Sequence, residues 1–348
     1  MFRILAADIG ATHCRFALFS SGSEATGTAL LRLEGELWFT GAEHATFRDV
    51  LVALLAHKES LYAPLASCSG IAVDIAVLAP AGPVQEGRCV MSNLDWIIDA
   101  GEARQVLGLD TVLLINDFAA QAYACCLPES VDAVAVFPGT AQAGFPMGVI
   151  GAGTGLGKSL ILDSPSAPND SGPGASRGIR RPFRARILPS EGGHEEFPFV
   201  GTEEFAFAAF AAQRAGTERL IGDNIVTGSG LAHLFAFHTG LDVTPPEATA
   251  RIQESPETLA WFARFYARSC RNYILDTLAL GGLYITGGMA LRLPVLEHPA
   301  FAEEFLASPT QKRLLVDVPV GHVRSPQAGL FGAALHGRLR LAAGIEAS

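Results

Sequence analysis

The chain has 348 residues, of which 49% are hydrophobic, and its formal net charge is -10 at pH 7. This length and apolar content predict one or two globular domains with a sizeable core and argue against intrinsic disorder. The negative charge argues against a nucleic-acid partner, because phosphate backbones bind to basic surfaces. The 6 cysteines include no C-x-x-C pair, which disfavours a zinc site and favours a reduced compartment.

The amino-terminal apolar run ends at Asp8 and is too short for a signal peptide. No apolar run along the chain reaches the length of a membrane span. We therefore expect a soluble cytoplasmic protein with no membrane partner.

Strand-like and helix-like segments alternate along the chain, which is typical of the α/β class. The predicted strands span residues 2–10, 14–21, 70–80 and 111–116, and a strand–turn–strand unit spans 147–163. The predicted helices span residues 46–58, 203–216, 258–280 and 329–344. Residues 163–186 are rich in Ser, Pro, Gly and Arg, which predicts a mobile loop. Its arginines could contact a phosphate or a partner, although such charged runs are usually solvated.

Two segments share one plan. Residues 6–16, AADIGATHCRF, and 149–159, VIGAGTGLGKS, each read as an apolar strand, a turn with glycine and threonine, and a second strand. The repetition predicts a duplicated core with a cleft between its halves, and such clefts commonly bind small ligands.

The stretch GAGTGLG, residues 151–157, is the one most typical of phosphate binding, because glycines let consecutive N–H groups approach an anion. Residues 152–159 nearly match the P-loop motif, but a P-loop feeds a helix. Here residues 160–162 predict a second strand instead. We therefore interpret the stretch as a phosphate-binding hairpin in which Lys158 is not a catalytic lysine; a flexible turn is the alternative.

The first hairpin, DIGATHCR, supplies Asp8, Gly10, Thr12 and Arg15. A carboxylate beside a glycine turn can hold magnesium through water while backbone N–H groups face a phosphate. Taken alone, the segment fits an ordinary hairpin equally well. A third glycine turn, TGGMA at residues 286–290, follows a strand-like segment and suits the flat face of a nucleotide.

The segment EGGHEEF places Glu191 and His194 on either side of two glycines, where the pair could hold vicinal hydroxyls. It does not match H-E-x-x-H, which excludes a zinc protease, and a surface turn is the alternative. His233 and His238 lie in an apolar helical segment and are expected to be structural.

Asn116 and Asp117 follow the buried strand-like run VLLI. The carboxyl end of a strand is where α/β proteins bind ligands, and a carboxylate there can accept a proton from a hydroxyl. The alternative is that the pair simply caps the helix that follows.

Read in order, several motifs make the chain resemble the bacterial ATP-dependent glucokinase family over nearly its whole length. These motifs are DIGATHCRFAL, LLINDFAA, IGAGTGLG, SEGGHEEF, DNIVTGSGL, YITGGMA and SPQAGLFGAALH. The resemblance implies an α/β, actin-like (ribonuclease H-like) duplicated fold whose two domains close on a central cleft. It implies a small domain of residues 1–116 plus 326–348 and a large domain of residues 117–325. The zinc-binding cysteine cluster of the related repressor-and-sugar-kinase group is absent from the sequence, as is its DNA-binding helix pair.

The resemblance implies ATP-dependent phosphorylation of a hexose, glucose above all, at its 6-hydroxyl, as the first step of glycolysis. It makes Asp117 the general base and places Asn116, Glu191, His194 and Asp223 around the sugar. The ATP-binding residues would be Asp8, Gly10, Ala11, Thr12, Gly153, Thr154, Gly155, Gly287 and Gly288. Magnesium would be held by Asp8 through water, and the protein would be a homodimer.

Two positions depart from the family pattern. Asp223 stands where the family usually has a longer Glu that touches the sugar, which leaves open a kinase for mannose, fructose or an amino sugar. The first turn has Ala11 and His13 where Gly-Gly-Thr-Asn is usual, and His13 could titrate near the phosphates. A non-catalytic sugar sensor is the alternative if these changes spoil the ATP site.

Overall fold

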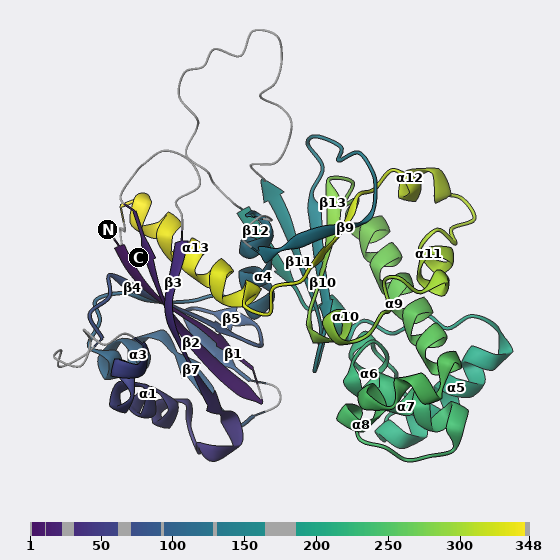
Figure 1. The fold of residues 1–348 in the computed structure, drawn as a ribbon, viewed down its shortest axis with the longest axis horizontal. Coiled ribbons are helices and arrows are strands. Elements are labelled where there is room, and N and C mark those ends of the chain that lie inside the picture. The colour runs from purple at the N-terminus through teal and green to yellow at the C-terminus, as the bar shows by residue number, and fades with distance from the viewer. Residues whose placement is uncertain are drawn as a thin grey trace, which may run out of the picture.

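The computed structural model describes residues 2–10, 12–22, 31–61, 71–91, 94–127, 131–163 and 186–344. The expectations for Ala11 and for nearly all of the Arg-containing loop fall outside these residues. Within them, no helix combines the length and hydropathy that crossing a bilayer requires. Two sheets of similar plan, each covered by helices on both faces, form the two halves of the structure (Figure 1).

The first sheet has the strand order β3-β2-β1-β4-β8. Strand β1 pairs antiparallel with β2 and parallel with β4, in a register that places Asp8 opposite Arg15. The strands are β1 (Phe2–Ile9), β2 (His13–Ser21), β3 (Leu31–Thr40), β4 (Ile75–Pro80) and β8 (Val112–Leu114).

Alternate residues of the first sheet bury against different helices, as the two-residue period of a strand requires. One face packs against α1 (Phe47–Ala56) and α3 (Ala100–Leu107). The opposite face packs against α13 (Ala328–Ala342), the last helix of the chain. The first half also contains a short helix, α2 (Lys58–Leu61), and a small sheet of β5 (Val84–Gln85), β6 (Arg88–Val90) and β7 (Ile97–Asp99).

The second sheet has the strand order β12-β11-β10-β13-β14-β9. Strand β10 pairs antiparallel with β11 and parallel with β13, which repeats the pairing of β1 with β2 and β4. The predicted duplication is therefore confirmed at the level of topology. The strands are β9 (Ala133–Phe137), β10 (Met147–Ala152), β11 (Leu156–Asp163), β12 (Arg186–Ser190), β13 (Gly282–Thr286) and β14 (Val320–Val323).

The second sheet packs against α9 (Pro256–Thr277) on one face and α4 (Asp117–Cys125) on the other. The remaining helices are α5 (Gly201–Ala215), α6 (Gly222–Ile225), α7 (Gly228–Thr239), α8 (Pro245–Ala250), α10 (Gly288–Arg292), α11 (Pro299–Phe305) and α12 (Lys312–Val316). All four predicted helices are present, and α9 is closed by Leu278 in the left-handed region.

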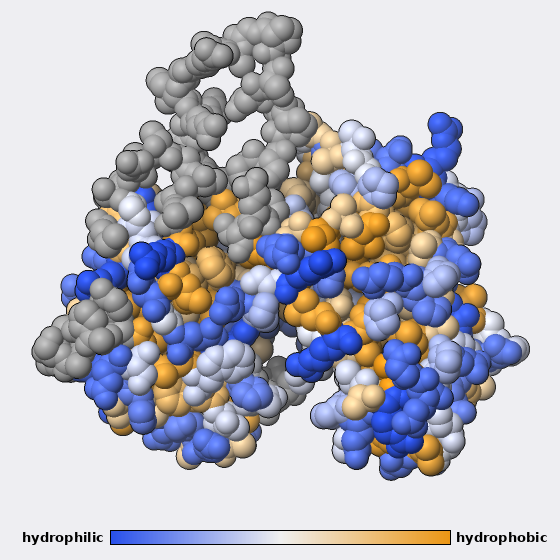
Figure 2. Space-filling view, viewed as in Figure 1, coloured by the Kyte–Doolittle hydropathy of each residue, from blue (hydrophilic) through white to orange (hydrophobic). Residues whose placement is uncertain are grey.

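The chain passes from the first sheet to the second after β8 and returns after β14, so it crosses between the halves twice. The helices that follow these crossings, α4 and α13, pack closely together. Gly332 of α13 allows this approach, since a Cβ there would lie 1.7 Å from the carbonyl oxygen of Ala120. In Figure 1, α4 lies between the two sheets, and Figure 2 shows the surface hollowed between the halves. The exact domain boundaries stay a prediction.

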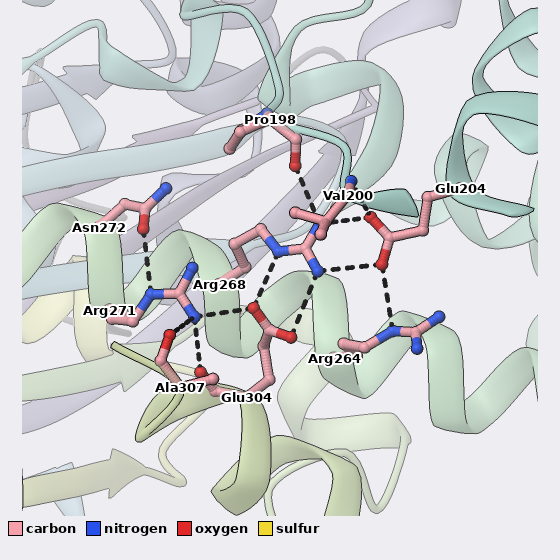
Figure 3. A network of polar contacts seen from close by, with 9 residues as sticks. All are labelled: Pro198, Val200, Glu204, Arg264, Arg268, Arg271, Asn272, Glu304 and Ala307. Carbon is pink, nitrogen blue, oxygen red and sulfur yellow. Dashed lines mark hydrogen bonds and ion pairs between the residues drawn. The ribbon is translucent and has the colours of Figure 1, made fainter. Parts of the chain in front are cut away.

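A buried ion network fixes the helices of the second half (Figure 3). Arg268 of α9 is 2% exposed and makes five hydrogen bonds, to Glu204 of α5, Glu304 of α11 and the carbonyl oxygen of Pro198. Glu204 also accepts the N–H of Val200 at 2.7 Å. A guanidinium with this many acceptors can be buried without an unpaired donor. The network thereby anchors the chain just after the Gly-Gly-His segment.

Replacing Arg268 with Met should lower the free energy of unfolding by about 3–5 kcal/mol, because two carboxylates lose their main buried partner. Urea unfolding monitored by circular dichroism measures this loss. The matched control is Arg219→Met, which removes an exposed arginine paired with Glu196 and should leave stability almost unchanged. Equal effects of the two substitutions would contradict a structural role for the network.

Candidate active site

The polar pair that follows β8 forms the first turn of α4. Asn116 is the N-cap, and its Oδ1 accepts the N–H groups of Phe118 at 3.0 Å and Ala119 at 3.1 Å. Its Nδ2 donates to Asp117 Oδ1 at 3.0 Å and to the carbonyl oxygen of Gly82 at 3.1 Å. The cap that we set against a functional role is therefore present, and the same amide also orients the Asp117 carboxylate.

Asp117 has the electrostatic character expected of a general base. Burial above all, together with the negative charges of Asp8 and Glu191 and against the opposing effect of the Phe118 N–H, raises the pKa of Asp117 to about 7. A carboxyl group whose pKa lies near neutral pH can accept a proton from a hydroxyl during a reaction.

A close contact joins the start of α4 to the second hairpin. The ring of Phe118 occupies the space beside Gly157 on β11, where a Cβ would lie 1.9 Å from ring atoms Cδ2 and Cε2. Gly157 thus serves packing, whereas the sequence suggested only phosphate binding for the glycines of this stretch. The contact places Asp117 next to the strand that leads out of the Gly153–Gly155 turn.

The second hairpin is strand–turn–strand, so the exclusion of a P-loop is confirmed. Its turn is closed by a hydrogen bond from Gly153 N to Gly155 O at 2.9 Å and held by one from Gly228 N to Gly153 O at 3.2 Å. In the described part of the chain, the N–H groups of Thr154 and Gly155 have no acceptor. Two adjacent open donors at a glycine turn are suited to a phosphate oxygen.

Lys158 holds the Glu191–His194 segment. Its Nζ is buried and donates to the carbonyl oxygen of Gly192 at 2.8 Å, with Glu195 Oε2 at 3.3 Å. It also lies 5.4 Å from the ring centroid of Tyr273. The lysine that gives this stretch its P-loop appearance is therefore a structural support.

The third glycine turn lies directly against the second. Gly287 has a φ of 91°, and a Cβ there would lie 2.6 Å from the carbonyl oxygen of Ala152. The buried hydroxyl of Tyr266 accepts the N–H of Ala152 at 3.1 Å and donates to the carbonyl oxygen of Thr286 at 3.3 Å. One tyrosine thus joins the ends of β10 and β13, which lead into the two turns.

The first turn is closed by a hydrogen bond from Gly10 N to His13 O at 3.0 Å. At the end of β1, Asp8 Oδ2 accepts a hydrogen bond from Arg15, which also donates to the carbonyl oxygen of Pro326 at 2.6 Å. Among the described residues, no group of three His, Cys, Asp or Glu side chains could hold a metal. A magnesium ion bound mainly by substrate phosphates and water needs only one such carboxylate, and Asp8 fits that need.

Glu191 precedes the short Gly192–His194 turn and His194 ends it, with Glu191 Oε2 and His194 Nδ1 separated by 3.5 Å. Both side chains are more than half exposed. Glu191 and Asn116 line a cavity of about 440 Å³ between the halves, whereas Asp117, His194 and Asp223 do not line it. The other walls are Pro83, Val84, Gln85, Leu114, Ile115, Ala119, Tyr123, Ile187, Pro189, Ser190 and His336.

Asp223 lies on α6, and its Oδ1 accepts the N–H of Leu156 at 2.8 Å. It therefore contacts the second hairpin, although the sequence suggested a contact with the sugar. The supporting roles of Phe118 and Tyr266 were not predicted, because their partners are distant in the sequence. The one available signal was Gly157, since a glycine inside a strand often marks a close approach.

A single strand–hairpin plan repeated in two halves, with the polar site between them, is the actin-like fold of two-domain kinases. Within that class the chain belongs to the glucokinase family, whose model matches residues 5–339. A curated glucokinase of Pseudomonas paraeruginosa is 32% identical over 94% of this chain and 90% of its own length. A glucokinase of Nostoc punctiforme is 28% identical over 75% of this chain and 81% of its own length.

Solved structures agree with this assignment. The crystal structure of glucokinase from an Antarctic psychrotroph has a TM-score of 0.70 at 26% identity and covers 97% of this chain and 98% of that one. The fold is also shared by the glucokinase of Balamuthia mandrillaris in complex with glucose, with a TM-score of 0.72 at 18% identity, covering 99% of this chain and 94% of that one.

The raised pKa of Asp117 predicts a pH-dependent effect of Asp117→Asn on stability. The ordinary pKa is 3.8 and the folded value is about 7, so the folded protein binds more protons than the unfolded chain between these values. Ionisation of Asp117 therefore lowers stability as the pH rises through this window. The variant should melt at a higher temperature than the wild type at about pH 8, and the difference should shrink toward about pH 5. A difference independent of pH would contradict the assigned pKa.

Gly157→Ala should lower the free energy of unfolding by about 1–3 kcal/mol, because the Phe118 ring and β11 must move apart. The second substitution in Gly157→Ala/Phe118→Leu should restore part of the loss, which a chemical denaturation series can measure. The control is Gly22→Ala, where a Cβ would meet nothing within 4 Å. An additive double variant would show that the two residues do not press on each other.

Proposed function

We propose that this protein transfers the γ-phosphoryl group of ATP to the 6-hydroxyl of a hexose, glucose above all. The observation that carries the proposal is the Asp117 carboxyl group, with a pKa of about 7, held at the start of α4 against the strand of the phosphate-type hairpin. Membership of the glucokinase family supports the same reaction. Two solved relatives are described as complexes with glucose, one of them with AMPPNP as well.

In this mechanism Asp117 accepts the proton of the 6-hydroxyl as its oxygen attacks the γ-phosphorus. A bond forms between the hydroxyl oxygen and phosphorus, the bond from phosphorus to the β–γ bridging oxygen breaks, and ADP leaves with the electron pair. Magnesium, held through water by Asp8, would neutralise phosphate charge. The turns at Gly10–Thr12, Gly153–Gly155 and Gly287–Gly288 would bind ATP.

Asn116, Glu191 and His194 are proposed to surround the sugar, with Asp223 behind them against the second hairpin. The Asn116 amide already orients Asp117, and closure of the two halves over the cleft would exclude water, which competes as a nucleophile. We place the reaction at the start of glycolysis in the cytoplasm and expect a homodimer.

Another hexose is the second candidate substrate, because Asp223 hydrogen-bonds the hairpin and this leaves its predicted sugar contact in question. A sensor without turnover is disfavoured, since binding alone does not require a carboxyl group tuned to accept a proton.

The test is ADP release by the purified protein with ATP and magnesium over a panel of hexoses. Asp117→Asn should lower kcat by about 10²–10⁴-fold, because the general base is lost. Asp110→Asn, at the exposed opposite end of β8, is the matched control and should keep the wild-type rate. In the wild type, kcat/KM should fall about tenfold per pH unit below the Asp117 pKa.

Turnover with a hexose other than glucose would keep the mechanism and correct the substrate. Glucose binding without turnover of any hexose would contradict the enzyme hypothesis and support a sugar sensor. A fully active Asp117→Asn variant would show that Asp117 is not the general base.

A further inference from the structure

The Asp223 carboxylate lies between two segments of the proposed site. These are the Gly153–Gly155 turn, proposed to bind the nucleotide (the nucleotide turn), and residues Glu191–His194, proposed to bind the sugar (the sugar segment). Asp223 Oδ1 accepts the N–H of Leu156 at 2.8 Å, and Leu156 is the residue that immediately follows the Gly153–Gly155 turn. A hydrogen bond from a backbone N–H to a carboxylate is about twice as strong as one between neutral groups. The exit of the nucleotide turn is therefore held by a side chain of α6.

The same carboxylate borders the sugar segment. A Cβ at Gly193 would lie 2.7 Å from Asp223 Oδ1 and 2.0 Å from the carbonyl oxygen of Leu156. On the other side, a Cβ at Gly155 would lie 3.0 Å from Asp223 Oδ2. Glycine is thus the residue that lets these three segments approach, and the packing leaves no space for the carboxylate to shift freely.

Further hydrogen bonds hold Asp223 in this place. Thr227 Oγ1 donates to the Asp223 carbonyl oxygen at 2.6 Å, and Gly222 N donates to the carbonyl oxygen of Glu195 at 3.0 Å. Lys158 donates to the carbonyl oxygen of Gly192 from β11. The sugar segment is consequently attached on both sides to the elements that carry the nucleotide turn.

We propose that Asp223 is a positioning residue that couples the two substrate sites by fixing the nucleotide turn against the sugar segment. Ordering of the Glu191–His194 segment by a hexose would then be transmitted through the carboxylate to the Leu156 N–H. Because this coupling presupposes the proposed function, its test uses binding rather than turnover. A direct sugar contact, in contrast, would affect hexose binding alone.

Isothermal titration calorimetry of the full chain measures the affinity for ADP with magnesium, without sugar, for the wild type and four variants. Asp223→Ala should weaken ADP binding by about tenfold, since an N–H at the turn loses its charged acceptor. It should also abolish the gain in glucose affinity that coupling predicts saturating ADP to give the wild type. Asp242→Ala, an exposed aspartate beyond α7, is the control and should match the wild type.

Two further variants of Asp223 distinguish a coupling role from a direct sugar contact. Asp223→Asn keeps an oxygen that can accept the Leu156 N–H, whereas Asp223→Glu keeps the charge but is one methylene longer than the packed site allows. Coupling predicts that Asn binds ADP within about twofold of the wild type and that Glu binds it more weakly. A sugar contact predicts that Glu restores glucose affinity and that ADP affinity is unchanged in every variant, which would overturn the proposal.

Hydrogen–deuterium exchange measures the protection of the Leu156 amide independently of turnover. The Leu156 amide should exchange faster in Asp223→Glu than in Asp223→Asn, and equal protection in the two would also overturn the proposal. A wild-type protein that binds no ADP would instead contradict the proposed function itself.

Discussion

The position of the candidate base depends on one contact, the ring of Phe118 lying against the bare backbone of Gly157. The Asn116 cap fixes the first turn of α4, so the ring and the neighbouring Asp117 carboxyl group move together. Gly157 belongs to β11, which begins at the nucleotide-type turn and continues to Lys158, the support of the Gly192–His194 segment. The proposed base, the turn proposed to bind phosphate and the Glu191–His194 segment are therefore all connected through one strand, and packing rather than loops sets the geometry among them.

Local signals in the sequence were sufficient for the duplicated hairpins and the long helices. Apolar runs interrupted by glycine predicted β1–β2 and β10–β11, and a helix-like segment predicted α5, which ends at a glycine in the left-handed region. Strand β3 was missed because charged residues punctuate it and its register depends on β2 and a bulge near Phe19. The strands of the small sheet are too short to show a period, so tertiary pairing alone defines them.

The candidate site was predictable residue by residue but not in its connections. Motif order indicated Asp117, Glu191 and the glycine turns, because each has the residue type its chemistry needs. The partners of Asp223 and Tyr266 lie far away in the chain, and no local pattern reveals them. The Asn116 cap shows a different limit, since a side chain can satisfy a helix terminus and orient a functional group at once, and the two interpretations were never exclusive.

The return of the last helix to the first sheet has a consequence for how the protein is made. Ile4 of β1 and Val77 of β4 are buried against Leu330 and Ala333 of α13, which is synthesised only after the whole second sheet. Until then one apolar face of the amino-terminal sheet has no cover, and exposed sheet surface of this kind promotes aggregation. Until α13 has been made, the nascent chain must therefore be kept from associating through this face, which makes its yield sensitive to chaperone supply.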